Sequence, residues 1–94
     1  MFGNLVKAVV DIKKNVMIVD ASMHADEEAV LLKSGSNQDD LWGINLYPDQ
    51  LGDDFIEFDS MINVRPRQNN FSRNVENESI QKKIISIVNS LIKR

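Results

Sequence analysis

Hydrophobic and polar residues alternate along three stretches of the chain, and each alternation predicts a β-strand with one face toward a core. The stretches are residues 5–12, 41–47 and 55–65. A fourth apolar stretch, Val16–Val19, does not alternate and is rich in β-branched residues, which favours an interior strand buried on both faces. The polar break at residues 13–15 suits a hairpin turn. The pattern therefore predicts four strands in two hairpins.

Two other segments have features that are typical of helices. Residues 25–33 carry acidic side chains in the first turn and a basic one in the last, as the helix dipole favours. We expect Ala25, Ala29 and Leu32 to face the core. A second helix is predicted to begin after the N-cap residue Asn77 and to run to the C-terminus. Its apolar stripe consists of Ile80, Ile84, Ile87, Val88 and Leu91, widened by Ile85 and Ile92.

The element order ββαββα predicts an α+β fold. We expect a four-stranded, mainly antiparallel sheet with the two helices packed on one face. A chain of 94 residues is too short for a second hydrophobic core, so residues 1–94 are predicted to form a single domain. A domain of this size buries a modest fraction of its surface, which makes a homodimer a reasonable expectation.

Composition narrows the location and the chemistry. The chain contains no cysteine, which excludes disulfides, thiolate zinc sites and cysteine nucleophiles. No stretch approaches the roughly 20 apolar residues of a membrane span, so a membrane is not an expected partner. Residues 1–7 lack the basic start and the long apolar run of a secretory signal peptide. We therefore expect a cytoplasmic protein.

The net charge of −3 is unevenly distributed along the chain. Residues 1–64 hold 12 acidic and 4 basic side chains, giving −8, whereas residues 65–94 hold 7 basic and 2 acidic side chains, giving +5. General nucleic-acid binding requires a dense basic surface, which this chain lacks as a whole. A local basic patch, self-association through opposite charges and internal pairing all remain compatible with the asymmetry.

The stretch 55–65 has a polar face that carries two carboxylates, an amide and a guanidinium, and a polar loop follows it as far as Arg73. Arginine forks match the geometry of phosphate and carboxylate groups. We therefore predict a site for an anionic ligand or a protein partner, formed by Asp59, Asn63, Arg65, Arg67, Asn70, Ser72 and Arg73. The competing interpretation is that these arginines only pair with the acidic strand face, which would otherwise be a solvated surface.

Longer motifs in the chain resemble a small prokaryotic family of unknown function. The resemblance rests on His24–Glu28, Asp40–Asn45, Tyr47–Pro48 and Glu57–Pro66, together with Asn70, Ser72 and Arg73. Family members tend to have a glycine and an arginine where Asn69 and Phe71 stand, and often begin with an additional N-terminal segment. The resemblance implies a domain of about this length and assigns no activity.

Two further functions compete with a binding module. A small hydrolase would use Glu57 or Asp59 with His24 and Arg65, because paired carboxylates suit acid–base work. The other alternative is a structural protein whose function is its dimer surface. His24 also precedes a run of acids, but ligands on a helix usually lie three or four residues apart, so no metal site is predicted. No glycine-rich phosphate loop is present, and no cofactor is predicted.

Overall fold

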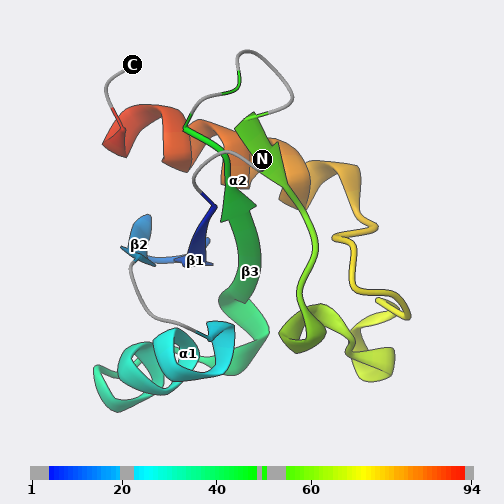
Figure 1. Cartoon of the computed structure of the whole chain (residues 1–94). Coiled ribbons are helices and arrows are strands. Elements are labelled where there is room, and N and C mark those ends of the chain that lie inside the picture. Colours follow the sequence, from blue (N-terminus) through cyan, green and yellow to red (C-terminus); the bar gives the residue numbers. More distant parts are fainter. Residues whose placement is uncertain (1–4, 20–22, 49, 51–54, 93–94) are drawn as a thin grey trace.

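The computed structural model describes residues 5–19, 23–48, 50 and 55–92. It confirms an α+β fold with one four-stranded antiparallel sheet and two helices (Figure 1). The regular elements are β1 (Val6–Asp11), β2 (Val16–Val19), α1 (His24–Lys33), β3 (Leu41–Leu46), β4 (Ile56–Glu57) and α2 (Glu78–Leu91). Within the residues that the structure describes, three short 3-10 helices join them: η1 (Gln38–Asp40), η3 (Met61–Asn63) and η4 (Pro66–Gln68).

The strands lie in the order β2-β1-β3-β4, and every neighbouring pair is antiparallel. β1 and β3 form the long central pair, with Val6 opposite Leu46 and Asp11 opposite Leu41. β4 pairs with β3 only at Asn45 and Leu46. Most of the outer edge of β3 is therefore not paired with a strand.

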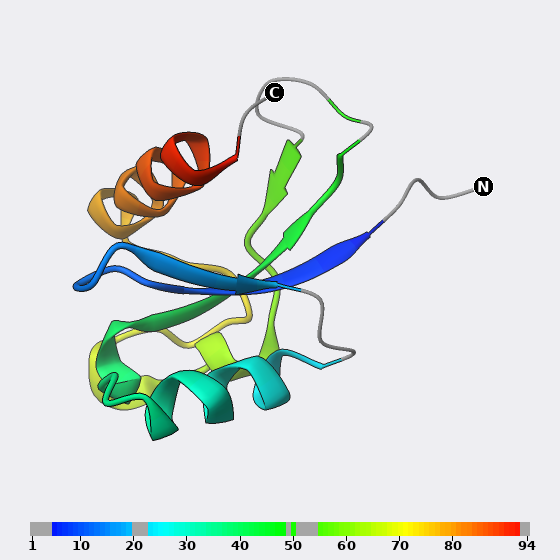
Figure 2. The ribbon, with the colours of Figure 1, turned by 90° about the vertical axis from the view of Figure 1, so that its left-hand side faces the viewer.

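The two helices lie on opposite faces of the sheet, so the prediction of both helices on one face is wrong (Figure 2). Ala8 and Val10 of β1 belong to the larger core under α2, whereas Val9, between them, belongs to a smaller core with Leu31 of α1. Successive strand residues point to opposite faces, and all three of these are fully buried. Buried apolar side chains therefore lie on both faces of β1, and each face needs a cover.

β2 lies at the edge of the sheet, where an interior strand was expected. Val16 and Val19 each retain 40% of their surface exposure, and Met17 and Ile18 are only partly buried. The prediction was wrong because an apolar run shows only the composition of a strand. Its position in the sheet depends on which strands pair with it. β1, buried on both faces, takes the interior position.

α1 buries a different set of residues from the one predicted. Ala25, Ala29 and Leu32 are exposed, while His24, Glu27 and Leu31 are buried. The helix is only weakly amphipathic, so its apolar residues do not determine which side faces the sheet.

α2 follows its prediction closely. The Asn77 side chain accepts hydrogen bonds from the backbone N–H groups of Ser79 and Ile80, at 2.8 and 3.1 Å. Ile84, Ile87 and Val88 are buried against the sheet, although Leu91 remains 49% exposed. Among the residues described here, no helix combines the length and apolar character needed to cross a membrane.

The predicted strand over residues 55–65 is much shorter than its alternation indicates. After Glu57 the chain leaves the sheet and enters η3. It passes over Gly43 of β3, where a Cβ atom would lie 2.6 Å from both Cβ and Oγ of Ser60. The absence of a side chain at position 43 is what allows this close approach.

We expect Gly43→Ala to destabilise the fold by about 1–3 kcal/mol, because the added methyl group would overlap Ser60. Urea unfolding would measure the loss. Adding Ser60→Gly to Gly43→Ala removes both overlapping atoms, so the double variant should be more stable than the sum of the single changes predicts. Strict additivity would contradict this account of the contact.

Candidate functional site

The outer edge of β3 is satisfied by side chains of the segment that follows β4. Asn63 is fully buried, and its amide forms two bonds with the backbone of Gly43. Its Oδ1 accepts from the Gly43 N–H at 2.8 Å, and its Nδ2 donates to the Gly43 carbonyl at 2.9 Å. The same Nδ2 donates to the Arg73 carbonyl at 3.0 Å. The Asn63 amide thus takes the place of a neighbouring strand, and its hydrogen-bonding atoms are engaged within the domain.

Arg65 continues the same edge. Its guanidinium donates to the backbone carbonyls of Gln38 and Leu41, and lies over the Trp42 ring with 4.1 Å from Cζ to the ring centroid. The side chain is 95% buried, since the residue keeps only 5% exposure. The structure therefore places this arginine in the core of the domain, where its charge is used in carbonyl bonds and a cation–π contact.

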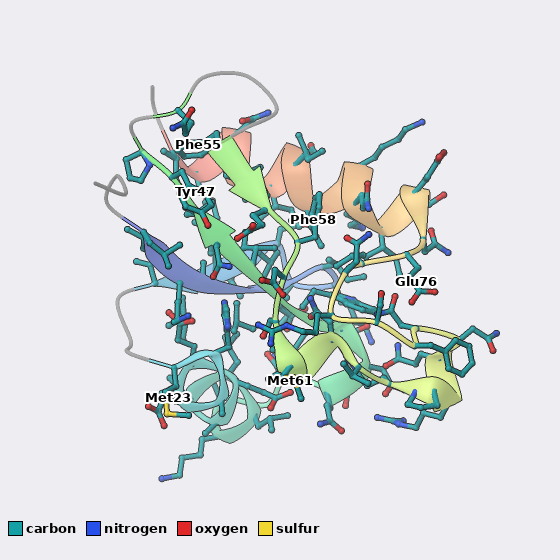
Figure 3. All side chains as sticks on the ribbon, turned by 45° about the vertical axis from the view of Figure 1, so that its right-hand side comes forward. Met23, Tyr47, Phe55, Phe58, Met61 and Glu76 are labelled. Atoms are coloured by element: carbon teal, nitrogen blue, oxygen red, sulfur yellow. The ribbon has the colours of Figure 1, made fainter. Side chains whose placement is uncertain are left out.

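Asn70 holds the loop after Arg65 closed. The two N–H donors of its Nδ2 are shared among the carbonyls of Asn63, Ser72 and Asn74, and its Oδ1 accepts from the Glu76 N–H. Ser72 donates its hydroxyl to Glu76 Oε2 at 2.8 Å. Figure 3 shows Glu76 in the segment that leads into α2. The polar side chains of this loop are thus largely engaged with one another and with the backbone.

A second group of polar residues gathers around the buried Asn45, and we call it the polar surface: Lys7, Asn45, Tyr47, Glu57, Asp59 and Arg73. The five residues other than Asn45 are partly or largely exposed. Lys7 of β1 lies opposite Asn45 of β3, and Asn45 lies opposite Glu57 of β4. This sequence of neighbours runs across three strands on the face that α1 partly covers.

Hydrogen bonds connect the members of the polar surface other than Lys7. Glu57 Oε1 accepts from Asn45 Nδ2 at 2.9 Å and from the Tyr47 hydroxyl at 2.7 Å. Asn45 Nδ2 also lies 3.3 Å from the Asp59 carbonyl. The bond to Glu57, with a smaller contribution from burial, raises the pKa of Tyr47, so this hydroxyl remains a donor. Figure 3 shows Tyr47 at the end of β3 beside β4.

Asp59 and Arg73 form an ion pair at the rim of the polar surface. Arg73 Nε lies 2.6 Å from Asp59 Oδ1, and the two side chains are 55% and 41% exposed. The backbone brings them together, because the Ser60 N–H donates to the Arg73 carbonyl at 3.1 Å. Of the predicted arginines, this is the one that meets the acidic strand face.

Arg67 lies away from the polar surface. It forms an ion pair with Asp39 of η1, with 2.6 Å between its Nη2 and Oδ1 of the carboxylate. The predicted site residues therefore divide into three groups: Asp59 with Arg73 on the polar surface, Arg67 beside η1, and the internally bonded Asn63, Arg65, Asn70 and Ser72.

His24 lies at the start of α1, and its Nε2 donates to the Ile44 carbonyl at 2.7 Å, which leaves Nδ1 as the acceptor of the neutral ring. Burial lowers the pKa of the imidazole below its ordinary value of 6.5. The Ile44 bond opposes this shift, while Lys7 and Arg73 add to it and Asp59 opposes it. His24 is thus a packed, neutral residue within electrostatic reach of the polar surface. Among the described residues, no three histidine or carboxylate side chains gather as a metal site.

Sequence reasoning did not select Lys7, Asn45 or Tyr47 as site residues. A signal was present, because Asn45 and Tyr47 share one face of the alternating stretch 41–47. What the alternation does not reveal is that Glu57 lies opposite Asn45, since that register is set by a β4 of only two residues.

We expect Arg65→Ala and Arg73→Ala to differ sharply in stability. Arg65→Ala leaves two backbone carbonyls without their donor and should cost on the order of 3 kcal/mol. Arg73→Ala removes an exposed ion pair and should change stability by less than about 1 kcal/mol. Urea unfolding of both variants would test this difference, and equal losses would contradict the assignment of roles.

The His24 pKa predicts a pH dependence of stability. A lowered folded pKa means that the unfolded chain binds a proton more readily, so the contribution of His24 is complete above about pH 6.5 and is lost as the pH falls below it. The free energy of unfolding should therefore decline between about pH 7 and 5. His24→Gln keeps a donor for Ile44 but does not titrate, so a similar decline in this variant would refute the prediction.

Comparisons with known proteins give one match. Neither a curated protein nor a solved structure matches the chain. The model of a family described as "Protein of unknown function (DUF5674)" matches residues 1–91. This agrees with the expected membership of a family of unknown function, and the match covers nearly all of the sequence. The chain therefore belongs to the DUF5674 family.

Proposed function

We propose that the chain is a non-enzymatic binding module that recognises an anionic group through the polar surface. The observation that supports this most directly is the contrast among the arginines. The Arg65 side chain is buried and donates to backbone carbonyls. The Arg73 side chain is 55% exposed at the edge of the polar surface. Polar side chains that a rigid sheet holds in place, yet leaves open to solvent, are suited to recognition.

The cations of the polar surface favour an anionic partner group. The Nε–H of Arg73 donates to Asp59, and the guanidinium has four further N–H donors. Lys7 supplies a second positive charge. The charges of Lys7 and Arg73 both help to lower the pKa of His24. The ligand is a carboxylate or phosphate group, on a small molecule or on an acidic segment of a partner protein.

Glu57 and Asp59 have supporting roles in this proposal. Glu57 fixes Asn45 and Tyr47 through one carboxylate oxygen, and Asp59 orients Arg73. An arginine that is already oriented loses less side-chain entropy when a ligand binds.

Binding is favoured over acid–base catalysis by the state of the same residues. The Nε2 of His24 is engaged with the Ile44 carbonyl, and its ring is neutral at neutral pH. Glu57 Oε1 already accepts two hydrogen bonds. These contacts hold His24 and Glu57 in place within the fold, which favours a positioning role for both groups over proton transfer.

The test is a titration followed by the backbone amide signals of ¹⁵N-labelled protein, with inorganic phosphate in one series and a tetraglutamate peptide in the other. Binding should shift the signals of Lys7, Asn45 and Asp59. Arg73→Ala should weaken binding by about tenfold or more, because a charged hydrogen bond is lost.

Arg67→Ala is the matched control, because it removes an arginine of similar exposure from an ion pair of the same length. It should leave the titration unchanged. Equal effects of the two substitutions would indicate non-specific charge attraction, and the absence of shifts with either probe would refute the proposal. A response to tetraglutamate alone would identify a protein segment as the source of the anionic group.

A further inference from the structure

A cavity of about 280 Å³ lies beside Trp42, on the face of the sheet that α2 covers. We call it the Trp42 pocket. β3 contributes Trp42, the loop that follows Arg65 contributes residues 68–70, the segment before α2 contributes Glu76 and Asn77, and α2 contributes Ile80. No member of the polar surface lines it, so the two sites are separate.

Buried polar groups at this pocket lack partners within the described part of the chain. Trp42 is 99% buried, with 1% exposure, and its Nε1–H has no hydrogen-bond acceptor there. Gln68 Oε1 has no donor, and Arg65 Nε, against the same indole ring, has no acceptor. An unsatisfied buried polar group costs free energy, and native proteins rarely retain several of them together. Their grouping beside a cavity indicates a ligand that supplies both an acceptor and a donor.

The charge of the pocket wall selects against anions. Glu76 Oε2 accepts from the Ser72 hydroxyl and from the backbone N–H groups of Phe71 and Ser72. These bonds, that of the Ser72 side chain foremost, lower the pKa of Glu76, so the carboxylate is ionised at neutral pH. A ligand carboxylate in the cavity would face this charge.

We infer that the Trp42 pocket binds a small, uncharged molecule that carries a carboxamide. The carboxamide oxygen would accept from Trp42 Nε1–H, and its NH₂ group would donate to Gln68 Oε1. Ile80 and the indole ring supply apolar contacts for the rest of the molecule. The cavity is slightly smaller than the 300–1,000 Å³ typical of drug-sized ligands, which limits the ligand to roughly the size of one ring with one substituent.

Three probes of nearly equal shape separate the contributions. Benzamide offers an acceptor and a donor, benzamidinium offers donors and a positive charge, and benzoate offers acceptors and a negative charge. Trp42 is the only tryptophan of the chain, so the single indole N–H signal and the fluorescence excited near 295 nm report on this pocket alone. Benzamide should bind with a dissociation constant on the order of 1 mM and move the indole N–H signal. Benzamidinium should bind more weakly, and benzoate should not bind.

Gln68→Met removes the acceptor at similar side-chain volume and should weaken benzamide binding by about tenfold. Gln38→Met makes the same chemical change at an exposed glutamine outside the pocket, so it should leave binding unchanged. Arg73→Ala should also leave it unchanged, which separates this test from that of the polar surface.

Any one of three results would overturn the inference. The first is that the indole N–H signal stays in place throughout the benzamide titration, as expected if only water occupies the cavity. The second is that benzoate binds as well as benzamide, and the third is that Gln38→Met weakens binding as much as Gln68→Met. Gln68→Glu keeps an acceptor at position 68 and should retain benzamide binding, and a loss as large as that of Gln68→Met would contradict the role assigned to Gln68.

Discussion

The outer edge of β3 imposes the constraint on which the C-terminal half of the structure depends. β4 pairs with only two residues of β3, which leaves the backbone groups of Leu41 and Gly43 without a strand partner. Buried backbone N–H and C=O groups need hydrogen bonds. The Asn63 amide supplies them for Gly43, and Arg65 supplies a donor for the Leu41 carbonyl.

These bonds require residues 58–65 to turn around the edge of β3. Ser60 and Ile62 lie over Gly43 on the α1 side, whereas Arg65 lies over Trp42 on the α2 side. Phe58, the first residue of this turn, packs against the core under α2 (Figure 3). Glycine at position 43 and asparagine at position 63 act together, because one permits the approach and the other satisfies the strand.

The same turn produces both sites that we propose. It places Asp59 next to Arg73 on one face, through the bond from Ser60 to the Arg73 carbonyl. On the other face it places Arg65 and the loop tip beside Trp42, which encloses the Trp42 pocket. The change of charge sign along the sequence at Arg65 therefore has no single structural counterpart. Arg65, Arg67 and Arg73 have three different environments, and only Arg73 contributes to the polar surface.

The elements with strong local signals were predictable. The alternation of β1 and β3, the apolar stripe of α2 and the cap at Asn77 agree with the structure because each depends on neighbours within the same element. Of the predicted site residues, Asp59 and Arg73 form an ion pair, as the competing interpretation of carboxylate–arginine pairing expects. Asn63, Arg65 and Asn70 were assigned to the same site. The sequence did not reveal that these side chains form hydrogen bonds with backbone groups elsewhere in the domain.

The sequence by itself determined the α+β class, four strands, the position of α2 and the presence of a polar segment after β4. Tertiary structure alone decided that the helices lie on opposite faces, that β2 is an edge strand and that α1 buries Glu27 in place of its alanines. It also decided that Arg65 is buried, and that of Arg67 and Arg73, which are both exposed, only Arg73 joins the polar surface. The physical reason is that periodicity records whether a residue is apolar, whereas the role of a polar side chain depends on which unpaired backbone group it meets.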